Sequence, residues 1–458
     1  MRSLGLEDVY SQIDGNLDEY LEGLFEMLSQ PSISTLGVGI KEMSELLRRT
    51  LEEIGFKATV IESAGHPFVY GEILTGDKKK PTVLIYGHYD VQPVEPLDAW
   101  ASDPFKPTVR EGRIYARGAG DNKGQLYAQL MGVKALMKFR GGRLLLNVKC
   151  IFEGEEENGS PNLGGFVKEH KDLLKADIVY TSDGPLHESG RPMLVFGVRG
   201  LLYVELTARG ASRDLHSGNW GGPVPNPAWD LVRLLGTMKD GNGRVLIGGF
   251  YQRVRKPTKK ERAAFRRIPL DRGAVAKSLG LDPSRLPPSE EFYAKLMAEP
   301  TLNICGIFGG YTGKGSKTMI PASASVKMDM RLVPDQEPDD IFRKLVEHVK
   351  EHGRDIEVKK MTSTRPSRTG LDSPYAEPIA RAVRDATGVE PVIYPSLGAT
   401  LPDYVFTQIL GVPSIIVPYA NIDESNHAPN ENIKVENFLR GIKCAAAVLE
   451  SLSRVKAP

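Results

Sequence analysis

Cysteine is scarce in this sequence, and neither sign of charge predominates. The 458 residues include three cysteines, Cys150, Cys305 and Cys444, which lie far apart and form no CxxC pair. Such a set excludes a disulfide-rich scaffold and a thiolate zinc knuckle, and it fits a reducing compartment. We therefore expect a cytoplasmic protein.

Charge and hydropathy exclude two further classes of protein. Lysine and arginine number 59 and aspartate and glutamate 58, a formal net charge of +1, whereas nucleic-acid-binding proteins carry a basic excess. No stretch approaches the roughly 18 apolar residues needed to cross a bilayer, and residues 1–12 lack the apolar core of a signal peptide. We expect neither a nucleic-acid partner nor a membrane partner.

The length allows for several domains, because at about 150 residues per domain a chain of this size is expected to contain two to four domains. Strand and helix patterns alternate over residues 1–198 and again over 367–458. That alternation is typical of an α/β domain with a mostly parallel sheet. Residues 199–366 have a different texture, with half-buried strands and amphipathic helices of their own. The simplest interpretation is a discontinuous α/β domain interrupted by an inserted α+β domain.

Hydrophobic periodicity predicts the individual elements. The pattern over 40–54 predicts a helix that ends at Gly55 as its C-cap, and the basic stretch 256–267 predicts a solvated helix face. Further helices are predicted over 17–28, 125–139, 162–174, 227–238, 339–352, 374–387 and 435–452. Strands are predicted over 58–61, 69–74, 82–86, 144–152, 177–181, 201–207, 325–332, 355–358 and 414–417, and near Val392.

Four of the predicted strands lead into side chains that commonly bind metals. The residues concerned are His88, the glutamate run 155–157, Asp183 and, after a loop, His427, while Asp121 lies in a glycine-bracketed loop before a helix. Ligands of open α/β sheets bind at the carboxyl ends of the strands. Imidazole and carboxylate donors without thiolate suit Zn²⁺ or Mn²⁺, and the set His88, Asp121, Glu157, Asp183 and His427 is large enough for two ions.

Each of these residues has a simpler explanation when it is taken alone. A single histidine is more often packed or exposed than a ligand, and the loop before Asp121 could be a turn and helix cap. A run of glutamates is usually solvated, yet adjacent carboxylates beside an apolar strand repel one another unless cations neutralise them. Asp90 shares a face with His88, so it either orients the imidazole or forms a surface salt bridge. The coincidence of five such residues favours a metal centre.

The insert contains three further candidates. His216 lies in a glycine-rich loop, Thr318 precedes a short apolar stretch, and Arg331 ends a strand. Taken singly, each is better explained without a function: His216 as a turn histidine, Thr318 as a strand-start threonine and Arg331 as an exposed arginine.

Four motifs taken together resemble the M20 metallopeptidases. They are GHYDVQP (87–93), RGAGDNKG (117–124), EGEEENGS (153–160) and DLHSG (214–218). The resemblance runs from about residue 17 to residue 450 in the family's motif order. It is strongest to the dipeptidase branch, which includes carnosinases and bacterial or archaeal relatives.

The resemblance implies a catalytic domain (1–198 and 367–458) with a dinuclear metal site, and an inserted lid domain (199–366) that also forms a homodimer. It implies hydrolysis of peptide bonds. His88 and Asp183 correspond to the ligands of one divalent metal and Glu157 and His427 to those of the other, and Asp121 corresponds to the bridging ligand. Asp90 corresponds to the residue that orients His88. The triple glutamate leaves a one-residue ambiguity, and the distance to Gly159-Ser160 favours Glu156 as the general base.

The resemblance also implies a set of substrate contacts. His216 resembles the lid histidine that reaches across the dimer to the scissile carbonyl. Thr318 and Arg331 resemble residues that receive the substrate's C-terminal carboxylate. Residues 398–402 (GATLP) stand where the family often has Gly-Gly-Ser/Thr-Ile-Pro. Ala399 departs from that pattern, which makes the contacts expected from Gly398 and Thr400 less secure.

The expected function is metal-dependent hydrolysis of dipeptides or short peptides. An N-acyl amino-acid amidase or desuccinylase that uses the same site is the alternative among enzymes. A non-enzymatic relic of the fold would have lost a ligand, whereas all five ligand positions are present.

Overall fold

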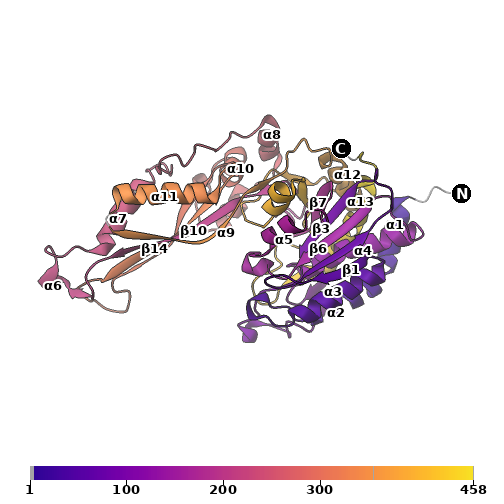
Figure 1. The fold of residues 1–458 in the computed structure, drawn as a ribbon, viewed down its shortest axis with the longest axis horizontal. Helices are drawn as coiled ribbons and strands as arrows, with labels where there is room; N and C mark the ends of the chain where they lie inside the picture. The colour runs from indigo at the N-terminus through magenta and orange to yellow at the C-terminus, as the bar shows by residue number, and fades with distance from the viewer. Residues whose placement is uncertain (1–4, 354, 457–458) are drawn as a thin grey trace.

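The computed structural model describes residues 5–353 and 355–456. An eight-stranded sheet and a four-stranded sheet lie in different parts of an elongated molecule (Figure 1). In the described part of the chain, none of the helices combines the length and apolar character that a membrane crossing requires.

The eight-stranded sheet contains the strands predicted at both ends of the chain. Its strands in spatial order are β1 (Lys57–Ile61), β2 (Phe68–Ile73), β6 (Asn147–Glu153), β3 (Thr82–His88), β7 (Ile178–Thr181), β18 (Ser414–Ile416), β8 (Met193–Val195) and β17 (Val392–Tyr394). The central strands β6, β3, β7 and β18 are parallel, whereas β1 and β2 run antiparallel to their neighbours. This confirms the predicted α/β class with a mostly parallel sheet.

Hydrophobic residues cover both faces of this sheet. Along β3, Val83 and Ile85 point into one core and Leu84 and Tyr86 into the other. The larger core is closed by α1 (Leu6–Gly15), α2 (Leu17–Ser29), α3 (Ile40–Ile54), α4 (Lys123–Phe139), α12 (Ala376–Thr387) and α13 (Val435–Leu452). The smaller one is closed by α5 (Leu163–Glu169) and a π-helical segment, Val405–Leu410.

The four-stranded sheet is antiparallel and one-sided. Its order is β12 (Thr301–Gly309), β14 (Ser323–Leu332), β10 (Gly200–Arg209) and β15 (Ile356–Thr364). Its buried face packs under α7 (Pro227–Met238) and α11 (Pro338–His352). Alternate residues of β14, namely Val326, Met328, Met330 and Leu332, enter this core. The predicted alternation of this strand is therefore confirmed.

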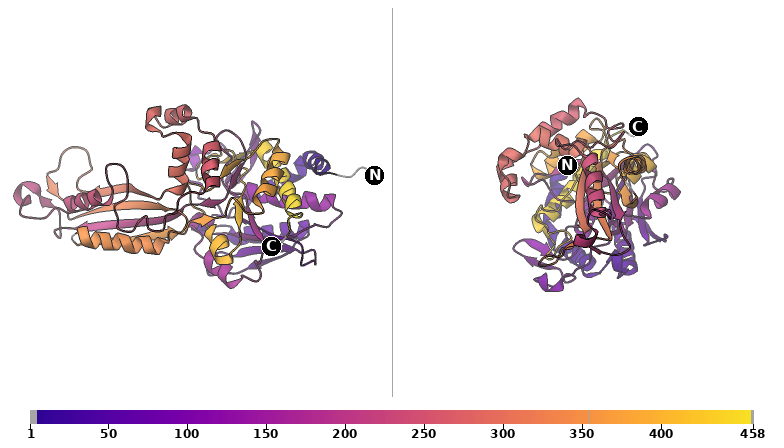
Figure 2. Two further views of the ribbon diagram at one scale, coloured as in Figure 1. Left: turned by 90° about the horizontal axis from the view of Figure 1, so that it is seen from above. Right: turned by 90° about the vertical axis from the view of Figure 1, so that its left-hand side faces the viewer.

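Short elements connect the two sheets and extend them. The chain crosses between the sheets at β9 (Gly197–Val198) and β16 (Ser367–Arg368), which pair with each other. The helices α8 (Lys259–Arg267), α9 (Arg272–Ser278) and α10 (Ser289–Ala298) lie beside this junction (Figure 2). The remaining short elements are β4 (Thr108–Arg110), β5 (Arg113–Tyr115), β19 (Asn432–Lys434), β11 (Leu215–His216), β13 (Met319–Ile320) and α6 (Ser217–Trp220).

Several predicted elements need correction. The helix expected over 162–174 ends at Glu169, and the strand expected over 355–358 continues to Thr364. The basic stretch does form a helix, α8, but its face with Ala264 and Phe265 is buried. Strand β12 was not predicted, because much of its apolar surface is exposed and no alternation marks a buried face.

The predicted C-cap at Gly55 is confirmed, because this residue has the left-handed backbone conformation, with φ of 110°.

Candidate metal centre

The predicted metal ligands come from five separate segments. His88 is the last residue of β3, and Asp183 follows the end of β7 by two residues. Glu157 lies in the 3₁₀ turn after β6, Asp121 in the loop before α4, and His427 in the loop between β18 and β19. Because β3, β6 and β7 are parallel neighbours, their carboxyl ends bring the first three of these segments to one edge of the sheet.

Asp121 lies at the middle of the cluster. Its Oδ1 is 3.1 Å from His88 Nε2, which is also 3.8 Å from Asp183 Oδ2. Its Oδ2 is 3.1 Å from His427 Nε2, which is also 3.1 Å from Glu157 Oε2. One donor atom from each residue of His88, Asp121 and Asp183 lies within 4.8 Å of the others, and the same holds for Asp121, Glu157 and His427. The donors fit two divalent ions that share one carboxylate.

The electrostatics of the cluster also fit cations. Burial raises the pKa of Asp183 to about 7, and the negative charge of Asp121 adds to the effect. Burial also raises the pKa of Glu156 well above its ordinary value, with His88 opposing this and nearby carboxylates reinforcing it. Glu424, a further buried acid beside the cluster, has its pKa raised to about 9 by burial and then by Asp121. So many carboxylates in one buried place are unfavourable as anions unless positive charge joins them.

The two histidines partly compensate this negative charge. Hydrogen bonds to Asp121 and then Glu157 raise the pKa of His427 to about 10. Although burial opposes it, hydrogen bonding to Asp121 and Asp90 raises the pKa of His88 above its ordinary value. The same hydrogen bonds lower the pKa of Asp121 despite its burial. Protons on these imidazoles thus supply part of the positive charge that bound cations would bring to the cluster.

The three consecutive glutamates have different surroundings. Glu155 accepts a hydrogen bond from Asn162 Nδ2 at 2.8 Å, and Glu157 accepts one from Gln92 Nε2 at 2.9 Å. Glu156 lines the cavity beside the ligands. This arrangement leaves Glu156 as the glutamate of the run that faces the open space.

Asp90 fixes this turn. Its carboxylate accepts hydrogen bonds from the backbone N–H groups of Glu156 and Glu157, at 3.2 and 3.1 Å. The same carboxylate lies 3.4 Å from His88 Nδ1, and the Asp90 carbonyl lies 3.2 Å from that nitrogen. Asp90 therefore contacts both the imidazole and the glutamate turn, and its burial excludes the alternative of a surface salt bridge.

A cavity of about 470 Å³ opens beside the cluster. Asp121, Glu156, Asp183 and His427 form its polar end, and Thr400 also lines it. Much of the remaining wall is apolar and consists of Leu186, Met193, Tyr394, Leu397, Leu401 and Ile422. The cavity offers a space in which a small molecule can reach the candidate ligands.

Gly398, Thr400 and Arg331 lie together where the two sheets meet. Arg331 Nη1 donates a hydrogen bond to Thr400 Oγ1 at 3.0 Å, and the Thr400 hydroxyl donates to the carbonyl of Arg199 at 2.8 Å. Arg199, which the sequence did not single out, donates from Nε to the carbonyl of Gly398 at 3.0 Å. Burial, with the nearby charge of Arg331, lowers the pKa of Arg199 to about 10. Two guanidinium groups thus converge near this side of the cavity.

His216 and Thr318 form a third group, apart from the other two. His216 Nε2 is 3.4 Å from Thr318 Oγ1, and both side chains are exposed. Figure 1 shows α6, which begins just after His216, at the end of the four-stranded sheet away from β3, β6 and β7. The single chain therefore does not bring His216 or Thr318 to the cavity.

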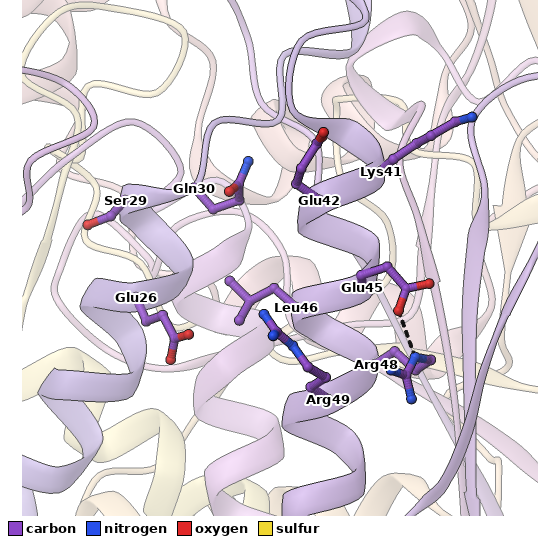
Figure 3. A pocket seen from close by; sticks show the side chains of 9 residues that line it. All are labelled: Glu26, Ser29, Gln30, Lys41, Glu42, Glu45, Leu46, Arg48 and Arg49. Atoms are coloured by element: carbon purple, nitrogen blue, oxygen red, sulfur yellow. Dashed lines mark hydrogen bonds and ion pairs between the residues drawn. The ribbon is translucent and has the colours of Figure 1, made fainter.

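An open groove between α2 and α3 contains none of the predicted site residues (Figure 3). Its walls are Glu26, Ser29, Gln30, Lys41, Glu42, Glu45, Leu46, Arg48 and Arg49. Arg48 already pairs with Glu45 at 2.8 Å and with Glu52 at 2.6 Å. We assign it no catalytic part.

Residues 84–451 match the family model described as Peptidase family M20/M25/M40. The chain belongs to this family. It is 31% identical to the Cys-Gly metallodipeptidase dug1 of Schizosaccharomyces pombe, over 99% of each chain. It is 30% identical to the human Beta-Ala-His dipeptidase, over 98% of this chain and 93% of that protein. The crystal structure of an M20 family metallo-carboxypeptidase from Sulfolobus solfataricus matches with a TM-score of 0.87 and 40% identity, covering 95% and 99%.

Membership of a peptidase family confirms the resemblance read from the motifs. The sequence nevertheless gave no sign of three buried residues beside the motifs, namely Arg199, Glu424 and Glu431. Glu424 and Glu431 lie within a polar loop that suggests exposure, and Arg199 stands between short apolar strands without a motif of its own. These residues are recognised by their burial, which depends on tertiary packing and cannot be read from the sequence.

We predict that metal binding releases protons at neutral pH. His427 with a pKa of about 10 is protonated there, and Asp183 with a pKa of about 7 is partly protonated, yet both must lose their protons to bind a metal. Metal affinity should therefore rise with pH through the neutral range. Calorimetric titration with Zn²⁺ in buffers of different ionisation enthalpy at pH 7.5 measures the release, and His427→Ala should reduce it. Equal proton release by both proteins would contradict this assignment.

Proposed function

We propose that this protein is a dipeptidase that uses two divalent metal ions per subunit, Zn²⁺ or Mn²⁺, to hydrolyse dipeptides and short peptides. The observation that carries the proposal is Asp121, whose two carboxylate oxygens each lie 3.1 Å from a different histidine. The names of the similar dipeptidases from yeast and human support the substrate class.

The two groups of donors suggest the role of each ligand. His88 and Asp183 would hold one ion, Glu157 and His427 the other, and Asp121 both. Asp90 would act as the positioning residue that orients His88, and its hydrogen bonds to the glutamate turn support that role. When bound, the two ions supply Lewis acidity, which polarises the scissile carbonyl and makes the attacking water more acidic.

Glu156 is proposed as the general base. It lines the cavity at the metal ligands, and its raised pKa brings it closer to the operating pH than an ordinary carboxylate. Its carboxylate would take the proton of the attacking water and then deliver it to the leaving amine. Protonation and release of the amine complete cleavage of the peptide bond.

The substrate carboxylate would bind near Arg331 and Thr400, at the junction of the sheets. A guanidinium offers a planar pair of donors that matches a carboxylate, and Thr400 links this group to the cavity. Gly398 and Thr318 are proposed to complete these contacts. Thr318 precedes β13, which pairs with β11 beside α6 at the far end of the molecule, so a contact from Thr318 would come from a second subunit.

We propose a homodimer in which residues 199–366 act as a lid domain and the remaining residues, 1–198 and 367–458, as the catalytic domain. Strand β12 is an edge strand of the four-stranded sheet, and Ile304, Ile307 and Phe308 on it are 51%, 59% and 53% exposed. An exposed apolar edge of this kind favours pairing with another chain. In such a dimer, His216 would reach the scissile carbonyl in the active site of the partner subunit.

Two other activities use the same chemistry. An N-acyl amino-acid amidase or desuccinylase would cleave the same kind of amide bond. Its substrate carries an acyl group in place of the N-terminal amino acid of a dipeptide. The similar metallo-carboxypeptidase from Sulfolobus solfataricus raises a second candidate, removal of C-terminal residues from longer peptides. We further propose a cytoplasmic location, because the three cysteines are all free thiols in the structure.

A substrate panel separates these activities. We predict that free dipeptides are cleaved with the highest kcat/KM, ahead of tripeptides, N-blocked peptides and acylated amino acids with the same C-terminal residue. The assay is release of the C-terminal amino acid after supplementation with Zn²⁺ or Mn²⁺. A preference for acylated amino acids would reject the dipeptidase in favour of the amidase, and a preference for longer blocked peptides would favour the carboxypeptidase.

Replacing Glu156 by glutamine should lower kcat about 10²–10⁴-fold, because the amide cannot accept the water's proton. Metal stoichiometry should stay unchanged, since Glu156 is not one of the proposed ligands. Glu155→Gln is the matched control, because its side chain contacts Asn162 rather than facing the cavity. If the control loses activity instead, the base is one residue earlier in the run.

Mixed dimers test the role of His216. His216→Ala and Glu156→Gln subunits should each be inactive as homodimers, whereas a heterodimer regains one working site if His216 acts across the interface. The measurement is the activity of heterodimers purified through two different affinity tags. Verified heterodimers without regained activity would contradict a role in the partner's site.

A further inference from the structure

Glu431 is a buried carboxylate close to the metal ligands that contacts neither the cavity nor a ligand side chain. It follows His427 by four residues, and only 1% of its surface is exposed. Oε1 accepts hydrogen bonds from the backbone N–H groups of Gly120 and Asp121, both at 2.9 Å. Oε2 accepts from the N–H of Gly118 at 3.1 Å and from Arg117 Nη1 at 2.8 Å. One carboxylate therefore gathers four donors from a single loop.

This loop carries Asp121, the residue that both groups of metal ligands share. The loop is also closely packed against Glu424, because a Cβ at position 120 would overlap the carboxylate of that residue. Glu431 holds the backbone nitrogen of Asp121 itself, so it fixes the point from which that side chain extends. The main chain of Glu431 also accepts a hydrogen bond from Ala116 N at 3.2 Å.

Arg117 anchors the arrangement on its other side. The guanidinium, 1% exposed, donates from Nη2 to the carbonyl of Pro93 at 2.9 Å and lies 5.2 Å from the centre of the Trp100 ring. Pro93 belongs to the segment that follows His88 and Asp90. The ion pair of Arg117 and Glu431 thus connects three segments, which bear His88, Asp121 and His427.

We propose that Glu431 is a positioning residue for the metal centre, which sets Asp121 between the two histidines. This inference rests on the proposed function, because it assumes that Asp121 holds metal ions. A carboxylate is needed here, because it can accept all four N–H donors. The amide of glutamine would turn an N–H₂ group toward N–H donors and leave Arg117 buried without its counter-charge.

Glu431→Gln tests this role through metal affinity, measured by competition of Zn²⁺, and separately Mn²⁺, with a chromophoric chelator. Residues that orient metal ligands typically contribute about 10–100-fold to metal affinity, and we expect a loss in that range. All the ligands remain, so excess metal should restore most of kcat and leave the enzyme with a higher metal requirement.

Glu450→Gln is the matched control. Glu450 is 3% exposed and pairs with Arg140 Nη2 at 2.6 Å, in a pair that joins α13 to the end of α4 and contains no part of the site. The control should lower thermal stability like Glu431→Gln but leave the metal affinity within about twofold of the wild type. An equal loss of affinity in both variants would reduce the role of Glu431 to general stability and overturn the proposal.

Arg117→Gln and the wild-type protein provide two further measurements. If Glu431→Gln does not fold, Arg117→Gln keeps the carboxylate and its three backbone N–H donors, and it should weaken metal binding by less than tenfold at pH 7.5. If Arg117→Gln binds metal more than tenfold more weakly, Arg117 rather than the Glu431 carboxylate positions Asp121, and the proposal is overturned. Wild-type protein that binds no divalent metal would overturn the proposed function together with this inference. Wild-type protein that binds two ions, with Glu431→Gln binding as tightly, would overturn this inference alone.

Discussion

The mutual repulsion of buried carboxylates is the constraint on which the rest of this structure depends. Asp121, Asp183 and Glu156 lie together at one edge of the large sheet, and Glu424 stands behind them. Anions that are removed from water at such a short separation are stable only beside positive charge. The histidines supply part of it when protonated, and metal ions supply more. The site is therefore better suited to holding cations than to remaining without them.

A rigid sheet makes this concentration of charge possible. The strands β3, β6 and β7 are packed on both faces, so the positions just past their ends are fixed by the backbone. The loop of His427 is less regular, since Ser425, His427 and Asn430 have positive φ values of 58°, 56° and 62°. Residues other than glycine seldom adopt this backbone conformation without support from the surrounding structure. Asn432 provides that support by donating Nδ2 hydrogen bonds to the carbonyls of Glu424 and Asn430.

The sequence was informative wherever one periodicity dominated. Helix 40–54 was predicted to the residue, and the alternation of β14 located its buried face, because each presents a single apolar side to one core. The convergence of the five candidate ligands was predictable because strand ends and motif residues coincided. Glu431 was not predictable, because most of its partners are backbone N–H groups that the sequence does not identify. Strand β12 was not predicted, because its apolar residues remain exposed in the single chain and therefore show no alternation of buried and exposed positions.

The departure of Ala399 from the family pattern is easier to judge from the packing than from the sequence. A Cβ at position 398 would lie 2.8 Å from Leu296 Cδ1, so the glycine at this position allows the close approach of the leucine side chain. Ala399, in contrast, lines the open cavity, where a methyl group meets no such restriction. Thr400 keeps its hydrogen bonds to Arg331 and to the carbonyl of Arg199. The closely packed glycine of this turn is therefore Gly398, and the alanine that follows it leaves the hydrogen bonds between Arg331, Thr400 and Arg199 in place.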